Sequence, residues 1–173
     1  MDFDFGAVEA WNGVWDDADR QTVDWWQGAL TRGRRVRLVG GSDAHKIGSE
    51  RSPVNCVYAR GRDAASILAA LRQGHSYVSE NARTANIAFC CPSGMMGDTV
   101  AYAPRTTFAL RVDNAGERSR VRVITDKGVE VEEETRGGRL RIDVPMQRRL
   151  FYRVEVVKSN GLPEALSNPI YVE

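Results

Sequence analysis

The feature that most constrains this fold is a change in apolar spacing near residues 81–86. Beyond it no stretch has a helical period, and apolar side chains occupy every second position. These positions are Phe108, Leu110, Val112, Val121, Val123, Val129, Val131, Leu140, Ile142, Val144, Tyr152, Val154 and Val156. Such strands, separated by turn sequences, predict a β-sandwich of about six or seven strands. We therefore expect an α/β part at 1–82 and an all-β domain at 83–173.

The first part has the pattern of a strand, a helix and a second strand. Phe5–Trp11 is a mostly apolar run that ends at the turn sequence Asn12-Gly13, which is typical of a strand covered on both faces. Asp16–Thr31 is predicted as a helix because an acidic residue is available to cap its first turn. Arg35–Val39 is predicted as the next strand. A right-handed crossover would make the two strands parallel.

A second strand and helix follow in the same part. Val54–Ala59 is predicted as a strand and Asp63–Gln73 as a helix that ends before Gly74. Ser76–Ser79 is short and extended. The helical spacing predicts that one apolar face points inward; its residues are Ile67, Leu68 and Leu71.

The second predicted strand ends in the most informative motif, Gly40-Gly41-Ser42-Asp43-Ala44-His45. The glycines allow a sharp turn, and the turn would place Asp43 and His45 at the carboxyl end of the strand, where α/β enzymes keep their chemistry. Carboxylate and imidazole groups both bind divalent metals. The alternative, an aspartate that caps a turn and a histidine that fills a loop, stays open at this point.

Four segments together resemble the last part of the PHP (polymerase and histidinol phosphatase) phosphoesterase domain. They are residues 7–13, the motif at 40–45, residues 55–59 and residues 67–79. The similarity is greatest to the carbaryl-hydrolase-like branch, which carries a β-rich C-terminal domain that ends in a segment such as Ala165–Val172. The resemblance implies a hydrolase of phosphate or other esters on a distorted (β/α) barrel with a cluster of divalent zinc, manganese or iron.

The chain departs from that family in its metal ligands. Members open with a His-x-His motif and carry further histidine and glutamate ligands, and none of these is in this sequence. Asp43 and His45 match the last two family ligands, so the resemblance implies the C-terminal part of such an enzyme with an incomplete metal site. Whether the chain itself is an active enzyme stays open.

Other polar residues are expected to line the same cavity. Glu9 and Asn12 lie at the end of the first parallel strand, and Ser42 lies within the motif. Lys46 and Arg51 follow in a polar loop and would offer charged donors to a substrate phosphate. For this loop, simple solvation is the alternative.

The remaining histidine and the cysteines are interpreted as structural. His75 occupies a position where the family commonly has arginine, and we expect a partly buried histidine that binds no metal. Cys56 falls in a predicted strand and is expected in the core. Cys90 and Cys91 have no third soft ligand nearby in sequence, so neither a metal site nor a vicinal disulfide is expected.

Composition limits the partners. Of 173 residues, 42% are hydrophobic and 27% charged, and the formal net charge is +1, which gives no electrostatic case for nucleic acid. No apolar run approaches a membrane span and the N-terminus is acidic, so no membrane contact and a cytoplasmic location are expected. The first strand would keep an unpaired edge, which predicts a homo-oligomer or a missing N-terminal segment that covers it.

Three functions remain open from the sequence. The first is a metal-dependent hydrolase of small phosphoesters or esters. The second is a non-catalytic interaction module of the same descent. The third is a ligand-binding protein that uses the tryptophan-rich region, although aromatic clusters are more often core; the residues are Trp11, Trp15, Trp25 and Trp26.

Overall fold

The structure is a computed structural model, and it describes residues 5–46, 48 and 52–173. Two helices and fourteen strands lie in these ranges. In chain order they are β1 (Ala7–Asn12), α1 (Asp17–Thr31), β2 (Arg37–Gly41), β3 (Val54–Val57), α2 (Ala64–Gln73), β4 (Ser76–Ser79), β5 (Asn86–Cys91), β6 (Gly94–Met95), β7 (Thr99–Val100), β8 (Thr107–Asp113), β9 (Arg120–Thr125), β10 (Gly128–Glu134), β11 (Leu140–Pro145), β12 (Phe151–Val157), β13 (Pro163–Ser167) and β14 (Ile170–Val172).

The expected strand–helix–strand unit is present at the start of the described chain. β1 and β2 are parallel, with Ala7 opposite Arg37 and Asn12 opposite Gly41. Helix α1 begins after Asp16, whose carboxylate accepts hydrogen bonds from the first turn in a capping box with Asp19. The helix packs on β1 through a separate apolar cluster that includes the fully buried Trp26. The prediction of a parallel pair is therefore confirmed.

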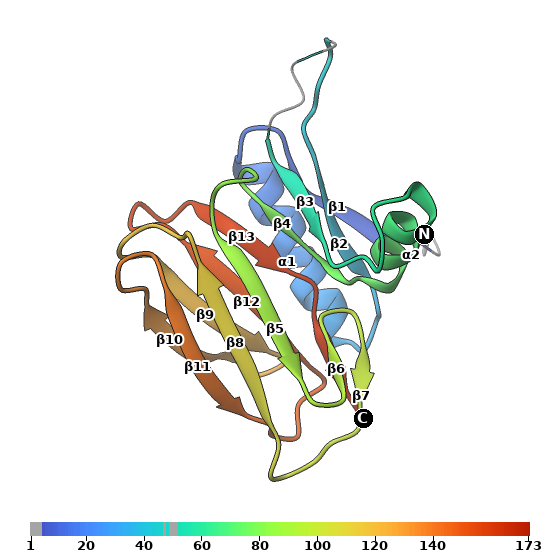
Figure 1. Ribbon diagram of the computed structural model, residues 1–173, viewed down its shortest axis with the longest axis vertical. Coiled ribbons are helices and arrows are strands. Elements are labelled where there is room, and N and C mark those ends of the chain that lie inside the picture. The colour runs from blue at the N-terminus through green and yellow to red at the C-terminus, as the bar shows by residue number, and fades with distance from the viewer. Residues whose placement is uncertain (1–4, 47, 49–51) are drawn as a thin grey trace.

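The rest of the described chain is mainly antiparallel sheet, and its two sheets form a sandwich (Figure 1). The larger sheet has the order β10-β9-β12-β13-β4-β3, with β14 and β7 attached, and the smaller has the order β11-β8-β5-β6. Side chains of both sheets meet in one core, where Phe108 lies 4.5 Å from Tyr152 between ring centroids. The alternating apolar positions of β8, β9 and β12 all face this core, as predicted.

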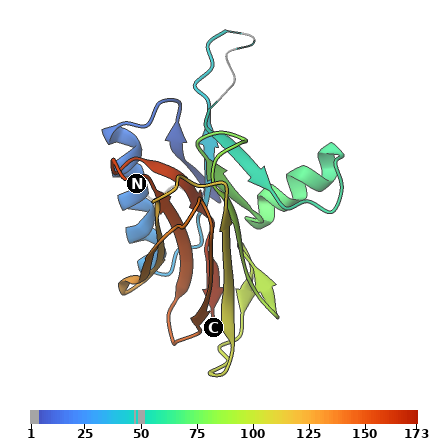
Figure 2. The same cartoon turned by 60° about the vertical axis from the view of Figure 1, so that its left-hand side comes forward.

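The two parts expected at 1–82 and 83–173 share one sheet. β3 and β4 come from the first part, yet β4 pairs with β13, with Leu166 opposite Val78. The described strands form no closed barrel; β1 and β2 are a two-stranded sheet beside the sandwich (Figure 2). Neither helix of the described chain has the length and apolar character that crossing a membrane requires.

One expectation about helix α2 is wrong. Ile67 and Leu68 were expected to point inward, but 36% of Ile67 and 47% of Leu68 are exposed. Figure 2 shows the reason, because α2 projects from the body and only its base meets the sheet. Ala70 is the one buried residue of the helix. Helical spacing identified an apolar face correctly but not what covers it.

Two asparagine side chains join β2 to the larger sheet in place of a strand ladder. Asn168 Oδ1 accepts a hydrogen bond from the Leu38 amide at 2.7 Å, and Asn168 Nδ2 donates to the Leu38 carbonyl at 3.1 Å. Asn55 makes the same two bonds to Gly40: its Oδ1 accepts from the Gly40 amide at 3.0 Å, and its Nδ2 donates to the Gly40 carbonyl at 2.7 Å. A side-chain amide has the donor and acceptor of a peptide group, so each asparagine satisfies one residue of the β2 edge.

We predict that Asn168→Ala lowers the free energy of unfolding by about 2–4 kcal/mol, because it leaves the Leu38 peptide buried without a partner. Asn168 is 1% exposed and also donates to Ser76, so no water replaces it easily. Urea denaturation followed by tryptophan fluorescence measures the change. Asn160→Ala, in an exposed turn, is the control and should cost less than about 1 kcal/mol; equal effects for the two variants would contradict this role of Asn168.

Candidate functional site

The loops that follow β1 and β2 lie against each other at the carboxyl ends of these strands. The Gly13 amide donates to the Gly41 carbonyl at 2.8 Å, one step beyond the last strand pair. Gly13 has φ +67°, and a Cβ atom there would lie 3.2 Å from the Asp43 Cβ. Glycine at this position therefore allows the two loops to approach closely. The ends of β1 and β2 and the loop that carries Asp43 therefore lie at one edge of one parallel pair.

Asp43 and His45 lie side by side in the loop after β2. His45 Nε2 is 3.1 Å from Asp43 Oδ1, and the two side chains are 84% and 55% exposed, respectively. Asp43 adopts φ 51°, a left-handed conformation that aspartate tolerates better than most residues. The turn brings the carboxylate and the imidazole to the same side, where both are open to solvent.

The other residues that were expected to line the cavity differ in their exposure and contacts. A side chain at Gly41 would overlap the Glu9 carboxylate, so Glu9 lies across the end of β2, as expected from the strand pairing. Asn12 is exposed, and its backbone amide donates to Asp19 Oδ1 at 2.9 Å. Ser42 is half-buried and Lys46 is exposed. Arg51 lies outside the described residues.

The described residues do not group into a complete metal centre. The 3.1 Å between Asp43 Oδ1 and His45 Nε2 is the distance of a direct histidine–aspartate contact, and it is close to the separation of about 3.3 Å between two atoms bound to one tetrahedral zinc ion. A catalytic zinc usually has three protein ligands. Among the described residues, no three histidine, cysteine, aspartate or glutamate side chains are grouped so that they could hold a metal.

A second histidine–aspartate pair lies away from this loop. His75 Nε2 is 2.8 Å from Asp98 Oδ1, and the other Asp98 oxygen accepts a hydrogen bond from the Met95 amide at 2.9 Å. His75 is partly buried, as expected, and it follows the end of α2. The pair therefore fastens α2 to the turn between β6 and β7. Sequence reasoning could not find Asp98 as the partner because 23 residues separate the two.

The tryptophans divide between core and surface. Trp11 and Trp26 are buried, and the Trp26 indole donates to the Val36 carbonyl at 2.7 Å. Trp15 packs on the edge of Trp11, with 5.2 Å between ring centroids, and its buried indole nitrogen has no hydrogen-bond partner in the described structure. Trp25 is 39% exposed and stacks on Phe5. Half of the group is thus core.

The three cysteines are free thiols in three environments. Cys90 and Cys91 are neighbours on β5, so they point to opposite faces; Cys90 is exposed and Cys91 is buried. Cys56 lies in β3 near Tyr77, whose pKa is raised by burial first and by Cys56 second. The arrangement agrees with the expectation of no vicinal disulfide.

Comparison with protein-family models, with curated proteins and with solved structures finds no match to this chain.

We predict that a thiol reagent modifies Cys90 first in the native protein and Cys91 last. Exposure decides the order, because a buried thiol reacts only after the sheet opens. Time-resolved labelling with an aromatic disulfide, followed by peptide mass spectrometry, gives the order. Cys90→Ser should remove the fast phase and leave the slow one; a fast phase that survives this substitution would contradict the assignment.

Proposed function

We propose that this chain is part of a metal-dependent hydrolase of small phosphate or other esters, of the PHP type, and that it contributes Asp43 and His45 as two metal ligands. The observation that carries the proposal is the 3.1 Å separation of the carboxylate and imidazole atoms at the carboxyl end of a parallel strand. Oxygen and nitrogen ligands together suit divalent zinc, manganese or iron.

The free edge of β1 supports the proposal. Within the described ranges β1 pairs with β2 and with no other strand. Beside this edge lies an open apolar groove of about 440 Å³, where Phe5, Val8 and Trp25 are among the lining residues. An unpaired strand next to uncovered apolar surface is a site for further strands. Strands added there would extend the parallel sheet toward a (β/α) barrel and bring the missing ligands, whether from another segment or from a second chain.

The chain's own residues would bind and position the metal, and we assign no catalytic step to them. A bound divalent ion would supply an activated water and stabilise negative charge on the ester. Glu9 lies across the end of β2 and would add negative charge at the strand end that precedes the pair. Lys46 follows in the exposed loop and offers a donor to a phosphate group.

A non-catalytic interaction module is the second candidate. The observation that favours it is the exposure of the pair, since 84% of the His45 side chain is open to solvent and no third ligand lies near it among the described residues. Functional metal ligands are usually held in place by surrounding hydrogen bonds. Metal binding by the pair separates the two candidates.

We predict that the isolated chain binds Zn²⁺ or Mn²⁺ weakly, and that His45→Ala lowers the affinity about tenfold or more because one of two ligands is lost. Isothermal titration calorimetry with the metal salts alone measures this. His75→Gln and Asp24→Asn are the controls, because they remove a histidine and an exposed acid far from the loop. Equal affinity of wild-type protein and His45→Ala would exclude the proposed ligand role.

We also predict that the isolated chain with saturating Mn²⁺ does not hydrolyse a generic aryl phosphate above the rate of free metal. Two ligands leave the ion without the third protein ligand that catalytic sites use. A steady-state assay with wild-type protein and Asp43→Asn tests this. Turnover by the isolated chain that is lost in Asp43→Asn would show a complete metal centre. It would contradict the proposal that the chain supplies only two of the metal ligands.

A further inference from the structure

The sandwich has two free strand edges on the same side. Among the described strands, β10 pairs only with β9 and β11 only with β8, so each is the last strand of its sheet. Figure 1 shows these two strands together at one side of the sandwich. An edge strand presents unpaired amide and carbonyl groups, which invite pairing with another chain unless charge or shape prevents it.

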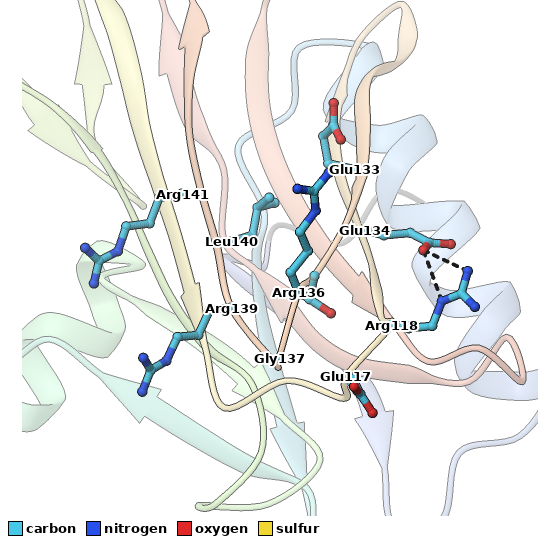
Figure 3. Close-up of a pocket in the computed structure, with 10 residues that line it drawn as sticks. Glu117, Arg118, Glu133, Glu134, Arg136, Gly137, Arg139, Leu140 and Arg141 are labelled. Atoms are coloured by element: carbon cyan, nitrogen blue, oxygen red, sulfur yellow. Dashed lines mark hydrogen bonds and ion pairs between the residues drawn. The ribbon is translucent and has the colours of Figure 1, made fainter.

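The space between these edges is a shallow cavity of about 630 Å³ (Figure 3). Leu140 lines this cavity and is half-buried, and elsewhere along the two edge strands Ile142 is half-buried and 55% of Val129 is exposed. In the described chain nothing closes this side of the sandwich. Further strands would bury this surface and continue both sheets.

The two edge strands carry opposite charge at corresponding positions along their length. The end of β10 carries Glu132, Glu133 and Glu134, whereas Arg139 directly precedes β11 and Arg141 is its second residue. Figure 3 shows Arg139 and Arg141 pointing away from the β10 of their own chain. They alternate with the half-buried Leu140 and Ile142, so they stand on the outer face of the last strand of the smaller sheet, where the side chains of a strand added to that edge would lie beside them.

The arginines of the β11 edge are poorly neutralised within the chain. Among the described residues Arg141 has no ion pair, and it lies opposite Arg111 in the sheet. Arg139 comes no closer than 3.9 Å to Asp113. On the other edge, Glu133 also has no ion pair in the described structure. Glu132 and Glu134 pair with Arg122 and Arg118 of the same chain, so Glu133 on one edge and Arg141 on the other are the charges that remain for a partner.

We propose that two copies of this chain associate through these edges, with β10 of each copy antiparallel to β11 of the other. β10 and β11 run in opposite directions because a tight turn with an antiparallel bridge between Arg136 and Arg139 connects them. A twofold axis along the strands would then set the acidic end of β10 beside the basic start of the partner's β11, twice per dimer. Both sheets would continue from one copy into the other.

The alternative symmetric arrangement is disfavoured by charge. If β10 paired with β10 of the second copy about Val131, Glu130 would face Glu132 across the interface, and like charges directly opposite each other destabilise a sheet. The proposed interface is also separate from the free edge of β1, so its test does not depend on the proposed hydrolase function.

Charge reversal tests the proposal. We predict that wild-type protein is a dimer, and that Glu133→Arg with Glu134→Arg, or Arg139→Glu with Arg141→Glu, weakens dimerisation about tenfold or more, because each reversal acts twice across the axis. The protein with all four substitutions should dimerise again, since the charges are then exchanged between the edges. Sedimentation velocity over a range of concentration measures association, and far-ultraviolet circular dichroism verifies folding.

Arg60→Glu with Arg62→Glu is the matched control, because both arginines are exposed and lie far from these edges. This variant should associate as the wild type does. A monomeric wild type at every concentration would overturn the proposal. So would reversal variants that dimerise normally, a folded fourfold variant that stays monomeric, or a control variant that loses association.

Discussion

The side-chain amides of Asn55 and Asn168 hold β2 in place, and the position of the candidate site depends on them. β2 forms a backbone ladder on one side only, with β1. On its other side the amide and carbonyl of Leu38 and of Gly40 bond to asparagine side chains that belong to the larger sheet or follow it. A buried peptide group without a hydrogen-bond partner is costly, so these bonds fix the position of β2 relative to the larger sheet. The loop with Asp43 and His45 then starts from a defined point.

Close packing explains why side chains replace a ladder at this boundary. A Cβ atom at Gly40 would lie 2.6 Å from Val78 Cγ1, so the β2 backbone already rests on the side chains of β4. A strand in that position cannot also lie in the plane of the larger sheet. The asparagine amides reach across the gap and let two sheets of different direction share one boundary. The parallel unit and the sandwich are joined at this line by polar bonds and, through Leu166 and Phe151, by apolar packing against α1.

Much of the fold followed from spacing alone. Alternation at Phe108, Leu110 and Val112 predicted the inward face of β8, and the glycine-rich motif predicted a turn that brings Asp43 near His45. These features are local, because period and turn chemistry act over a few residues.

Long-range partners were beyond the sequence pattern. Asn168 lies 130 residues from Leu38, and nothing in its neighbourhood marks it as a link between sheets. The four-residue strands β3 and β4 carry too few residues to reveal that they extend the sandwich across the expected division near residue 82. Ile67 and Leu68 had the right period for a buried face, but period does not say whether a neighbour is present. The free edges of β10 and β11 likewise appeared only with the sheet order, whereas an unpaired edge of the first strand was expected from the sequence.

Native-state hydrogen exchange of the Leu38 and Gly40 amides is the most direct measurement of the central claim that β2 and the sandwich form one cooperative unit. If the asparagine bonds join them, both amides should exchange only by global unfolding, with the same opening free energy as amides of the central strand β12. Exchange of Leu38 and Gly40 through a local opening of much lower free energy, while β12 stays protected, would show that the parallel unit moves independently and would contradict the account.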